Sequence, residues 1–287
     1  MKLLNRLFGG RLAPSWEVTP GATLWKLEVT SRGVLIGEAR DIDAKRMSLF
    51  AIDLETGSLL YSGREFDEPW WAALDSVIGD TAIIHRYPKP DMPNILGATS
   101  IDASTGEQLW SDGTLRVVCG TDQILLAQRG AVNEEPSLVF VDARTGAVLS
   151  DANDEQATVF ENACDDSTRW HGWISADIID EDDPRFNVLL PHLDKDDRRG
   201  SIEAAWFGRY TIVSAYVRSR HSADAMLQGQ LDNILLILDG DRVAYRETIA
   251  ARLPAPTSDS FFIRSGILYF IRNGRTLVAF DLRDDAP

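Results

Sequence analysis

Residues 100–111 read SIDASTGEQLWS, and this stretch decides the fold because two close copies of it occur elsewhere in the chain. Residues 51–62 read AIDLETGSLLYS, and residues 140–150 read FVDARTGAVLS. Each copy is an apolar strand, then Asp-x-x-Thr-Gly, then a second short strand. In such a turn the aspartate and threonine side chains bond to the backbone, and the glycine supplies the positive φ of a type I turn with a bulge. The three copies therefore predict three β-hairpins.

The apolar strand that ends in aspartate recurs in weaker form three more times. The later copies are VLLPHLD ending at Asp194, ILLILDG with Asp239, and LVAFDLR with Asp281. Successive aspartates are 40 to 52 residues apart, and most copies follow two earlier strands. Four short strands in each unit of this length are typical of a β-propeller blade. The sequence thus predicts an all-β chain forming a single β-propeller, with six four-stranded blades expected and five or seven left open.

Both ends of the chain fit a closed ring. The sixth unit stops after its third strand, and residues 14–18 (PSWEV) form a surplus strand ahead of the first unit. If that N-terminal strand completes the last blade, an exposed sheet edge is removed. The propeller domain is therefore expected over residues 15–287, behind a tail of residues 1–14. The fourth unit, residues 151–200, is degenerate, because Pro191 lies within its expected third strand.

The run Asp-x-x-Thr-Gly-x-x-Leu-Trp at residues 102–110 resembles the repeat of propellers related to the pyrroloquinoline-quinone dehydrogenases. The resemblance covers three units well and the others loosely. In that superfamily the motif is a structural hairpin that marks no chemistry. The quinone enzymes have more blades and a vicinal cysteine pair over the cofactor, whereas Cys119 and Cys164 are far apart in this sequence. The resemblance therefore implies a non-enzymatic, quinoprotein-like binding scaffold, and no cofactor is expected.

The charge of the chain limits its partners. The sequence has 29 lysines and arginines against 44 aspartates and glutamates, a formal net charge of −15. General nucleic-acid binding depends on basic groups that neutralise phosphates, so that class is excluded. No apolar run approaches the roughly 18 residues of a transmembrane helix. With two cysteines and no export signal, the cytoplasm is the expected compartment.

The first twelve residues, MKLLNRLFGGRL, combine three basic side chains with apolar ones at helical spacing. One interpretation is a short basic amphipathic segment that touches a membrane surface or a partner. The other is a tail whose apolar side chains cover the edge of a core.

One candidate site repeats at the ends of the second strands. In five of the six units this strand ends with an arginine: Arg40, Arg86, Arg129, Arg218 and Arg272. Most of the loops that follow are long, and long loops on a rigid scaffold often carry function. Guanidinium groups repeated on one face of an acidic protein predict binding of an anionic small molecule or an acidic protein partner. The alternative is that each arginine pairs with nearby carboxylates such as Asp41, Asp91 or Glu134, or lies along a neighbouring blade with its aliphatic stem buried.

Two tryptophan clusters are candidates for an aromatic platform that binds sugar or peptide: Trp70 with Trp71, and Trp170 with Trp173. Core packing is the alternative for these four rings. It is the expected role of Trp25 and Trp110, which lie within predicted strands.

Residues 151–197 contain 14 acidic and three basic side chains. Because Ca²⁺ takes six to eight oxygen ligands, a cation site is one interpretation. Solvated acidic loops are the other, since the glycine and terminal glutamate of an EF-hand are missing.

No catalytic motif is recognisable. His85, His171, His192 and His221 lack metal-binding spacing, and no G-x-S-x-G elbow occurs. Some six-bladed propellers are metal-dependent lactonases, and by that analogy several ligands are available: Asp41, Asp43, His85, Asp180 and His221. The sequence predicts a non-catalytic binding or scaffold protein, with a metal-dependent hydrolase that uses a central-channel site as the alternative.

Overall fold

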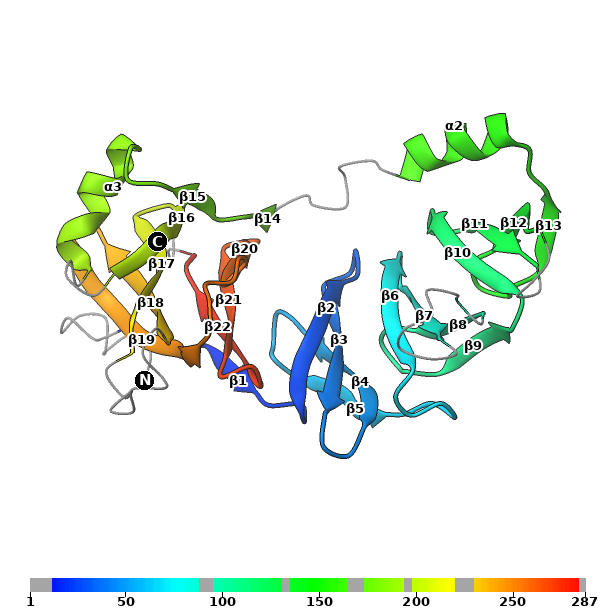
Figure 1. Cartoon of the computed structure of the whole chain (residues 1–287), viewed down its shortest axis with the longest axis horizontal. Coiled ribbons are helices and arrows are strands. Elements are labelled where there is room, and N and C mark those ends of the chain that lie inside the picture. Colours follow the sequence, from blue (N-terminus) through cyan, green and yellow to red (C-terminus); the bar gives the residue numbers. More distant parts are fainter. Residues whose placement is uncertain are drawn as a thin grey trace. The chain divides into compact units, whose positions relative to one another are not determined.

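The computed structural model describes residues 12–87, 95, 97–130, 135–164, 173–193, 198–219 and 230–283. The chain divides into two compact units. The first unit is Pro20–His171, and the second joins Met1–Thr19 to Gly172–Pro287. The described residues form five antiparallel sheets of four or five strands (Figure 1). The all-β class is confirmed, whereas the amphipathic segment predicted at the N-terminus lies mostly outside the described residues.

The first unit contains three four-stranded sheets, in each of which neighbouring strands are consecutive in the chain. Sheet A consists of β2 (Thr23–Val29), β3 (Val34–Asp41), β4 (Arg46–Asp53) and β5 (Leu59–Arg64). Sheet B consists of β6 (Ala72–Ile78), β7 (Thr81–Arg86), β8 (Ala98–Asp102) and β9 (Gln108–Asp112). Sheet C consists of β10 (Leu115–Gly120), β11 (Ile124–Arg129), β12 (Ser137–Asp142) and β13 (Val148–Asp151). These sheets correspond to the first three repeat units.

The Asp-x-x-Thr-Gly turns join the last two strands of each of these sheets. In all three turns the aspartate side chain accepts the threonine N–H at 2.7–3.0 Å. The glycine N–H donates to the aspartate carbonyl at 2.8–2.9 Å, and the glycine φ is 72°. In the first and third copies the threonine hydroxyl also donates to the aspartate, at 2.8 Å. The hairpins predicted at Asp53, Asp102 and Asp142 are confirmed, together with their turn chemistry.

An aromatic side chain in the last strand of one sheet packs against the turn of the next sheet. A Cβ on Gly146 would lie 2.8 Å from the Trp110 indole, whose Nε1 donates to a carbonyl of the same turn at 2.9 Å. Tyr61 takes the equivalent place beside Gly106, where a Cβ would lie 3.2 Å from its ring. Both aromatic residues stand eight positions after the motif aspartate, where the third copy has Ser150. This series of interlocked turns therefore ends with sheet C.

Buried side chains fill the space between neighbouring sheets of the first unit. Ile84 of β7 belongs to a buried cluster with Ile36 and Leu49 of sheet A. Its neighbour Ile83 belongs to a second cluster, with Leu115 and Leu125 of sheet C. Because successive side chains of a strand point to opposite faces, sheet B is buried on both of its faces.

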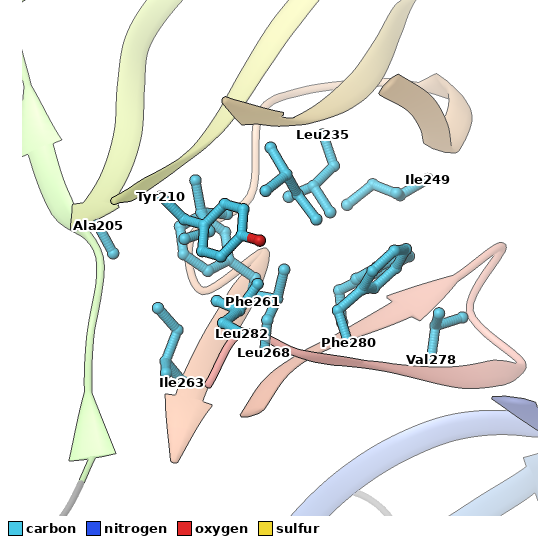
Figure 2. Close-up of a cluster of buried hydrophobic side chains, with 13 residues drawn as sticks. Ala205, Tyr210, Leu235, Ile249, Phe261, Ile263, Leu268, Val278, Phe280 and Leu282 are labelled. Carbon is cyan, nitrogen blue, oxygen red and sulfur yellow. The ribbon is translucent and has the colours of Figure 1, made fainter. Parts of the chain in front are cut away.

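The second unit contains two five-stranded sheets. Sheet D consists of β15 (Asp177–Ile179), β16 (Arg198–Phe207), β17 (Tyr210–Arg218), β18 (Leu231–Asp239) and β19 (Arg242–Leu253). Sheet E consists of β14 (Trp173–Ile174), β20 (Phe261–Arg264), β21 (Ile267–Arg272), β22 (Thr276–Asp281) and β1 (Trp16–Val18). Figure 2 shows the buried cluster between them, in which Tyr210 of sheet D meets Phe261 and Phe280 of sheet E.

The N-terminal strand pairs with the last strand of the chain. β1 lies antiparallel to β22, with Trp16 opposite Ala279 and Val18 opposite Leu277. Residues 14–18 thus supply a strand to the last sheet, as the sequence suggests. Closure of a ring of blades and a count of six stay predictions.

The fourth unit differs from its prediction. The sequence predicts a strand for VLLPHLD, but Pro184–Leu189 forms helix α3 and Leu190–His192 forms a 3₁₀ helix. Asp183 begins the helix by accepting the Arg185 N–H at 2.9 Å, with proline at the first helical position. The helix then packs against sheet D through Phe186 and Leu189. The expected third strand of this unit is therefore wrong.

Elsewhere in the fourth unit, the described residues include a helix and two strands of two or three residues. The two strands, β14 and β15, lie at the edges of sheets E and D. Helix α2 (Asp154–Cys164) begins with a reciprocal pair of side-chain bonds between Asn153 and Gln156, at 2.9 and 3.1 Å. Among the described helices, none has the length and apolar character needed to cross a membrane.

Candidate functional site

The five predicted arginines lie near the ends of second strands, but they do not share one register position. We count from the residue of the second strand that pairs with the motif aspartate or its equivalent. Arg86, Arg129 and Arg272 stand five residues beyond it, Arg40 six and Arg218 eight. Because side chains alternate between faces, the first three point toward the preceding sheet and the other two toward the following one.

Arg40 is held between sheets A and B. Its Nη2 donates to the carbonyl of Ala72 at 2.8 Å, and its Nη1 donates to the carbonyl of Trp70 at 3.1 Å. Its Nε is paired with Glu38, whose carboxylate is 1% exposed and also accepts the N–H of Leu74 at 2.8 Å. This guanidinium neutralises a buried carboxylate that joins the two sheets.

Arg272 also has its charge balanced by carboxylates. It donates to both oxygens of Glu17 in β1, at 2.7 and 3.0 Å, and its Nε lies 2.7 Å from Glu247 in β19. The hydrogen bonds and charge of Arg272 lower the pKa of Glu17. Burial and a hydrogen bond to Glu247 raise the pKa of Tyr245 to about 12. Arg272 therefore ties three strands of the second unit together.

Arg86 and Arg129 share the register position of Arg272 but form no ion pair within the described part of the chain; Asp91 and Glu134, two of the carboxylates predicted as partners, lie outside that part. Arg86 is half-buried, and its Nε is shielded from solvent without an acceptor. Arg129 is exposed. Burial tends to raise the pKa of Asp112, but hydrogen bonds from Thr114 lower it and the charge of Arg129 adds to that lowering. Arg218, on β17, is exposed and likewise lacks a carboxylate partner among the described residues.

The predicted aromatic platform residues occupy different surroundings. Trp70 and Trp71 form an edge-to-face pair with ring centroids 6.0 Å apart, and the Arg40 guanidinium lies 4.9 Å from the Trp70 ring. Trp173, in β14, packs on an aromatic ring of β20 with centroids 4.7 Å apart. Trp170 lies outside the described residues. Whether these rings bind sugar or peptide stays a prediction.

Trp25 differs from its predicted role in the core. It is 63% exposed, whereas Trp110 is buried as expected. Trp25 is the bulged residue of β2, because the residues on either side of it pair with consecutive residues of β3. A bulge redirects a side chain, and here the ring lies beside Arg40 with 5.7 Å from the ring centroid to Cζ. No feature of the sequence marks this bulge.

The residues available for a hydrolase are dispersed. His85 is 1% exposed, and its Nδ1 lies 3.3 Å from Oδ1 of Asp75. Asp41 accepts a backbone N–H of its own turn, and Asp180 accepts the hydroxyl of Ser201. In the described ranges, no three His, Cys, Asp or Glu side chains are grouped so that they could hold a metal ion. His221 lies outside those ranges.

Several carboxylates of the acidic segment have basic partners. Asp177 and Asp183 pair with Arg185 at 2.6 and 2.8 Å, and Glu181 pairs with Arg198 at 2.6 Å. Hydrogen bonds from Arg185 lower the pKa of Asp183. These carboxylates serve ion pairs and a helix cap. A cation site in this segment stays a prediction.

Comparison with known proteins gives a partial family match. A family model for a domain of unknown function (DUF4905) matches residues 29–110, less than a third of the chain. A search of curated protein sequences finds no match.

Solved structures resemble the chain only distantly. BamB from Moraxella catarrhalis is 10% identical, with 94% of this chain and 92% of that chain covered and a TM-score of 0.31. The β-propeller domain of the Trilobed protease from Pyrococcus furiosus is 13% identical, with coverages of 92% and 70% and a TM-score of 0.30. A DUF4221 family member from Bacteroides vulgatus is 8% identical, with coverages of 95% and 97% and a TM-score of 0.34. These values are too low to assign a function.

Proposed function

We propose that this protein is a non-catalytic binding protein that holds an anionic ligand or an acidic partner segment through strand-end arginines, chiefly Arg86 and Arg129. One observation supports the proposal above all. At the same register position, Arg272 is balanced by two carboxylates, while Arg86 and Arg129 form no ion pair with a described residue. In a chain with 44 acidic side chains, this difference favours a role in binding over one in packing.

The energetics of Arg86 favour the binding of an anion. A guanidinium whose Nε is shielded without an acceptor loses hydration and gains no bond in return, which costs about 1–3 kcal/mol. A bound carboxylate or phosphate would offset that cost, because charge-assisted bonds to a guanidinium are among the stronger hydrogen bonds in proteins.

The proposal includes the architecture of the scaffold. We take the sheets as blades of one quinoprotein-like propeller in the cytoplasm, with β1 adding a strand to the last blade. The connections that follow the second strands would then lie on one face. A metal-dependent hydrolase is not proposed, because no observation on the described residues favours it.

The test measures anion binding and thermal stability in a variant that lacks both arginines. The Arg86→Ala, Arg129→Ala double variant is titrated with inorganic phosphate and with citrate by calorimetry, beside the unmodified chain. We expect binding of these anions to be lost while the melting temperature stays nearly unchanged. Unchanged binding, or a large fall in melting temperature, would contradict the proposal.

A further inference from the structure

We propose that the junction of sheets A and B binds an anion that carries a flat apolar ring, with Arg86 holding the anionic group and Trp25 stacking on the ring. This inference rests on the proposed binding role of Arg86 and adds the chemical class of the ligand. The ligand is a free small molecule such as an aromatic carboxylate or phosphate ester.

Two arginines from different sheets meet at this junction. Arg40 points from sheet A toward sheet B, and Arg86 points from sheet B toward sheet A. Ala72 of β6 links them, because Nη2 of Arg40 donates to its carbonyl at 2.8 Å and Arg86 is its cross-strand partner in β7. Paired residues in neighbouring strands place their side chains on the same face, so Arg86 projects from the same face as the side chain of Ala72.

The charge of this junction calls for one anionic group. Glu38 neutralises Arg40, whereas the charge of Arg86 is not neutralised by any described residue. The Nε of Arg86 is buried without an acceptor, while the residue as a whole is half-buried, so part of its side chain is open to solvent. An arriving carboxylate or phosphate can therefore approach the terminal nitrogens and bind in the two-bond geometry that guanidinium groups favour.

The carboxylates near this junction do not remove its preference for an anionic ligand. Glu28 pairs with Lys26 at 3.4 Å, and Asp75 lies 3.3 Å from Nδ1 of His85. Lys26 also donates to the backbone carbonyl of Asp75. Glu28 in β2 and Asp75 in β6 thus have basic neighbours of their own, and Glu68, next to the junction, accepts the backbone N–H groups of Trp70 and Trp71.

An exposed aromatic face completes the site. The Arg40 guanidinium lies between two indoles, 5.7 Å from the centre of the Trp25 ring and 4.9 Å from that of Trp70. Trp25 is 63% exposed, so the face of its ring that Arg40 does not cover is open to solvent. Offset stacking of a second flat ring on such a face is favourable. Trp25 and Ala72, the cross-strand partner of Arg86, both lie next to the Arg40 guanidinium, and the proposed ligand spans the space between them.

The experiment uses three matched probes on the full chain. Phenyl phosphate has the ring and the anion, inorganic phosphate has the anion alone, and phenol has the ring alone. We expect phenyl phosphate to bind about tenfold more tightly than either of the others, as measured by calorimetry.

Two variants test the two proposed contacts, that of Arg86 with the anionic group and that of Trp25 with the ring. Arg86→Ala should weaken phenyl phosphate about tenfold or more, while Trp25→Ala should weaken it about fivefold and leave inorganic phosphate unchanged. Trp206→Ala is the matched control, because Trp206 is also exposed (41%) and also lies against an arginine, Arg185, at 5.2 Å. It should change neither affinity. If Arg86→Ala lowers the melting temperature, Arg86→Gln replaces it.

The outcomes separate this inference from the proposed function. Equal affinities for phenyl phosphate and inorganic phosphate, with no effect of Trp25→Ala, would overturn the aromatic ligand class while the anion site at Arg86 stands. No binding of either phosphate, or binding that Arg86→Ala leaves unchanged, would overturn both.

Discussion

Arg40 and Arg86 project into the same space between sheets A and B, yet the protein uses them differently. Arg40 bonds two carbonyls of the neighbouring sheet and neutralises the buried Glu38. Arg86 is half-buried and no described carboxylate pairs with it. Arg40 stands six residues beyond the strand residue that pairs with the motif aspartate, and Arg86 stands five residues beyond it.

This difference teaches that a residue type at a strand end does not define a role by itself. Arg40 and Glu38 are two residues apart in β3, so their side chains lie on the same face of the strand. Arg40 therefore pairs with a carboxylate of its own strand. Two residues before Arg86 stands Ile84, which is apolar and buried. The face that a side chain shares with its neighbours decides whether its charge is already neutralised.

The largest expected effect comes from Arg40. Arg40→Ala leaves the carboxylate of Glu38 buried without its cation, and we expect the free energy of unfolding to fall by about 3 kcal/mol. Urea denaturation measures this loss. Arg86→Ala removes no bond to a described residue, so it should not lower the free energy of unfolding by more than about 0.5 kcal/mol. Equal losses of unfolding free energy in the two variants would contradict the different roles assigned to Arg40 and Arg86.

A smaller effect is expected at Arg272, which is balanced like Arg40 but lies nearer the surface. Arg272→Ala removes bonds to Glu17 and Glu247, and we expect a loss of about 1–2 kcal/mol. Faster hydrogen exchange of the β1 amides should accompany the loss. Arg46→Ala is the control, because its pair with Glu65 is well exposed, and it should have no measurable effect. If β1 exchanges equally fast in both variants, Arg272 does not anchor that strand.

The smallest effect is a dependence on pH. Arg272 lowers the pKa of Glu17 from its ordinary value of 4.5 in the folded protein. The resulting stabilisation is complete above that value and is lost as the pH falls through the lowered one. Because Glu17 is 41% exposed, the contribution should stay below about 1 kcal/mol. Denaturation between pH 5 and pH 3 should show a shallower loss in Glu17→Gln than in the unmodified chain, and identical slopes would contradict this.

Much of the fold could be predicted because its turns are encoded locally. Each Asp-x-x-Thr-Gly turn forms its bonds within six residues, so the sequence alone specifies it. The strand predicted at VLLPHLD failed because a short apolar run fits either a strand or a helix. Asp183, directly before α3, and Pro184, its first residue, carry the cap signal that favours the helix.

The candidate site could be predicted only in outline. The arginines are evident in the sequence, but Arg40 and Arg129 stand at the same distance before their motif aspartates and still point to opposite faces, so only the strand pairing separates them. The carboxylates that neutralise Arg272 come from β1 and β19, far away in the chain, so no local pattern marks them. The exposure of Trp25 depends on a bulge, which is a property of strand pairing.

Ser150 gives the repeat a terminus. Tyr61 and Trp110 each present a flat surface on which the turn of the following sheet rests, and the third copy offers only a hydroxymethyl group. A turn placed after sheet C would have no aromatic ring at the position of Ser150 against which its glycine could pack. After β13 the chain continues as helix α2.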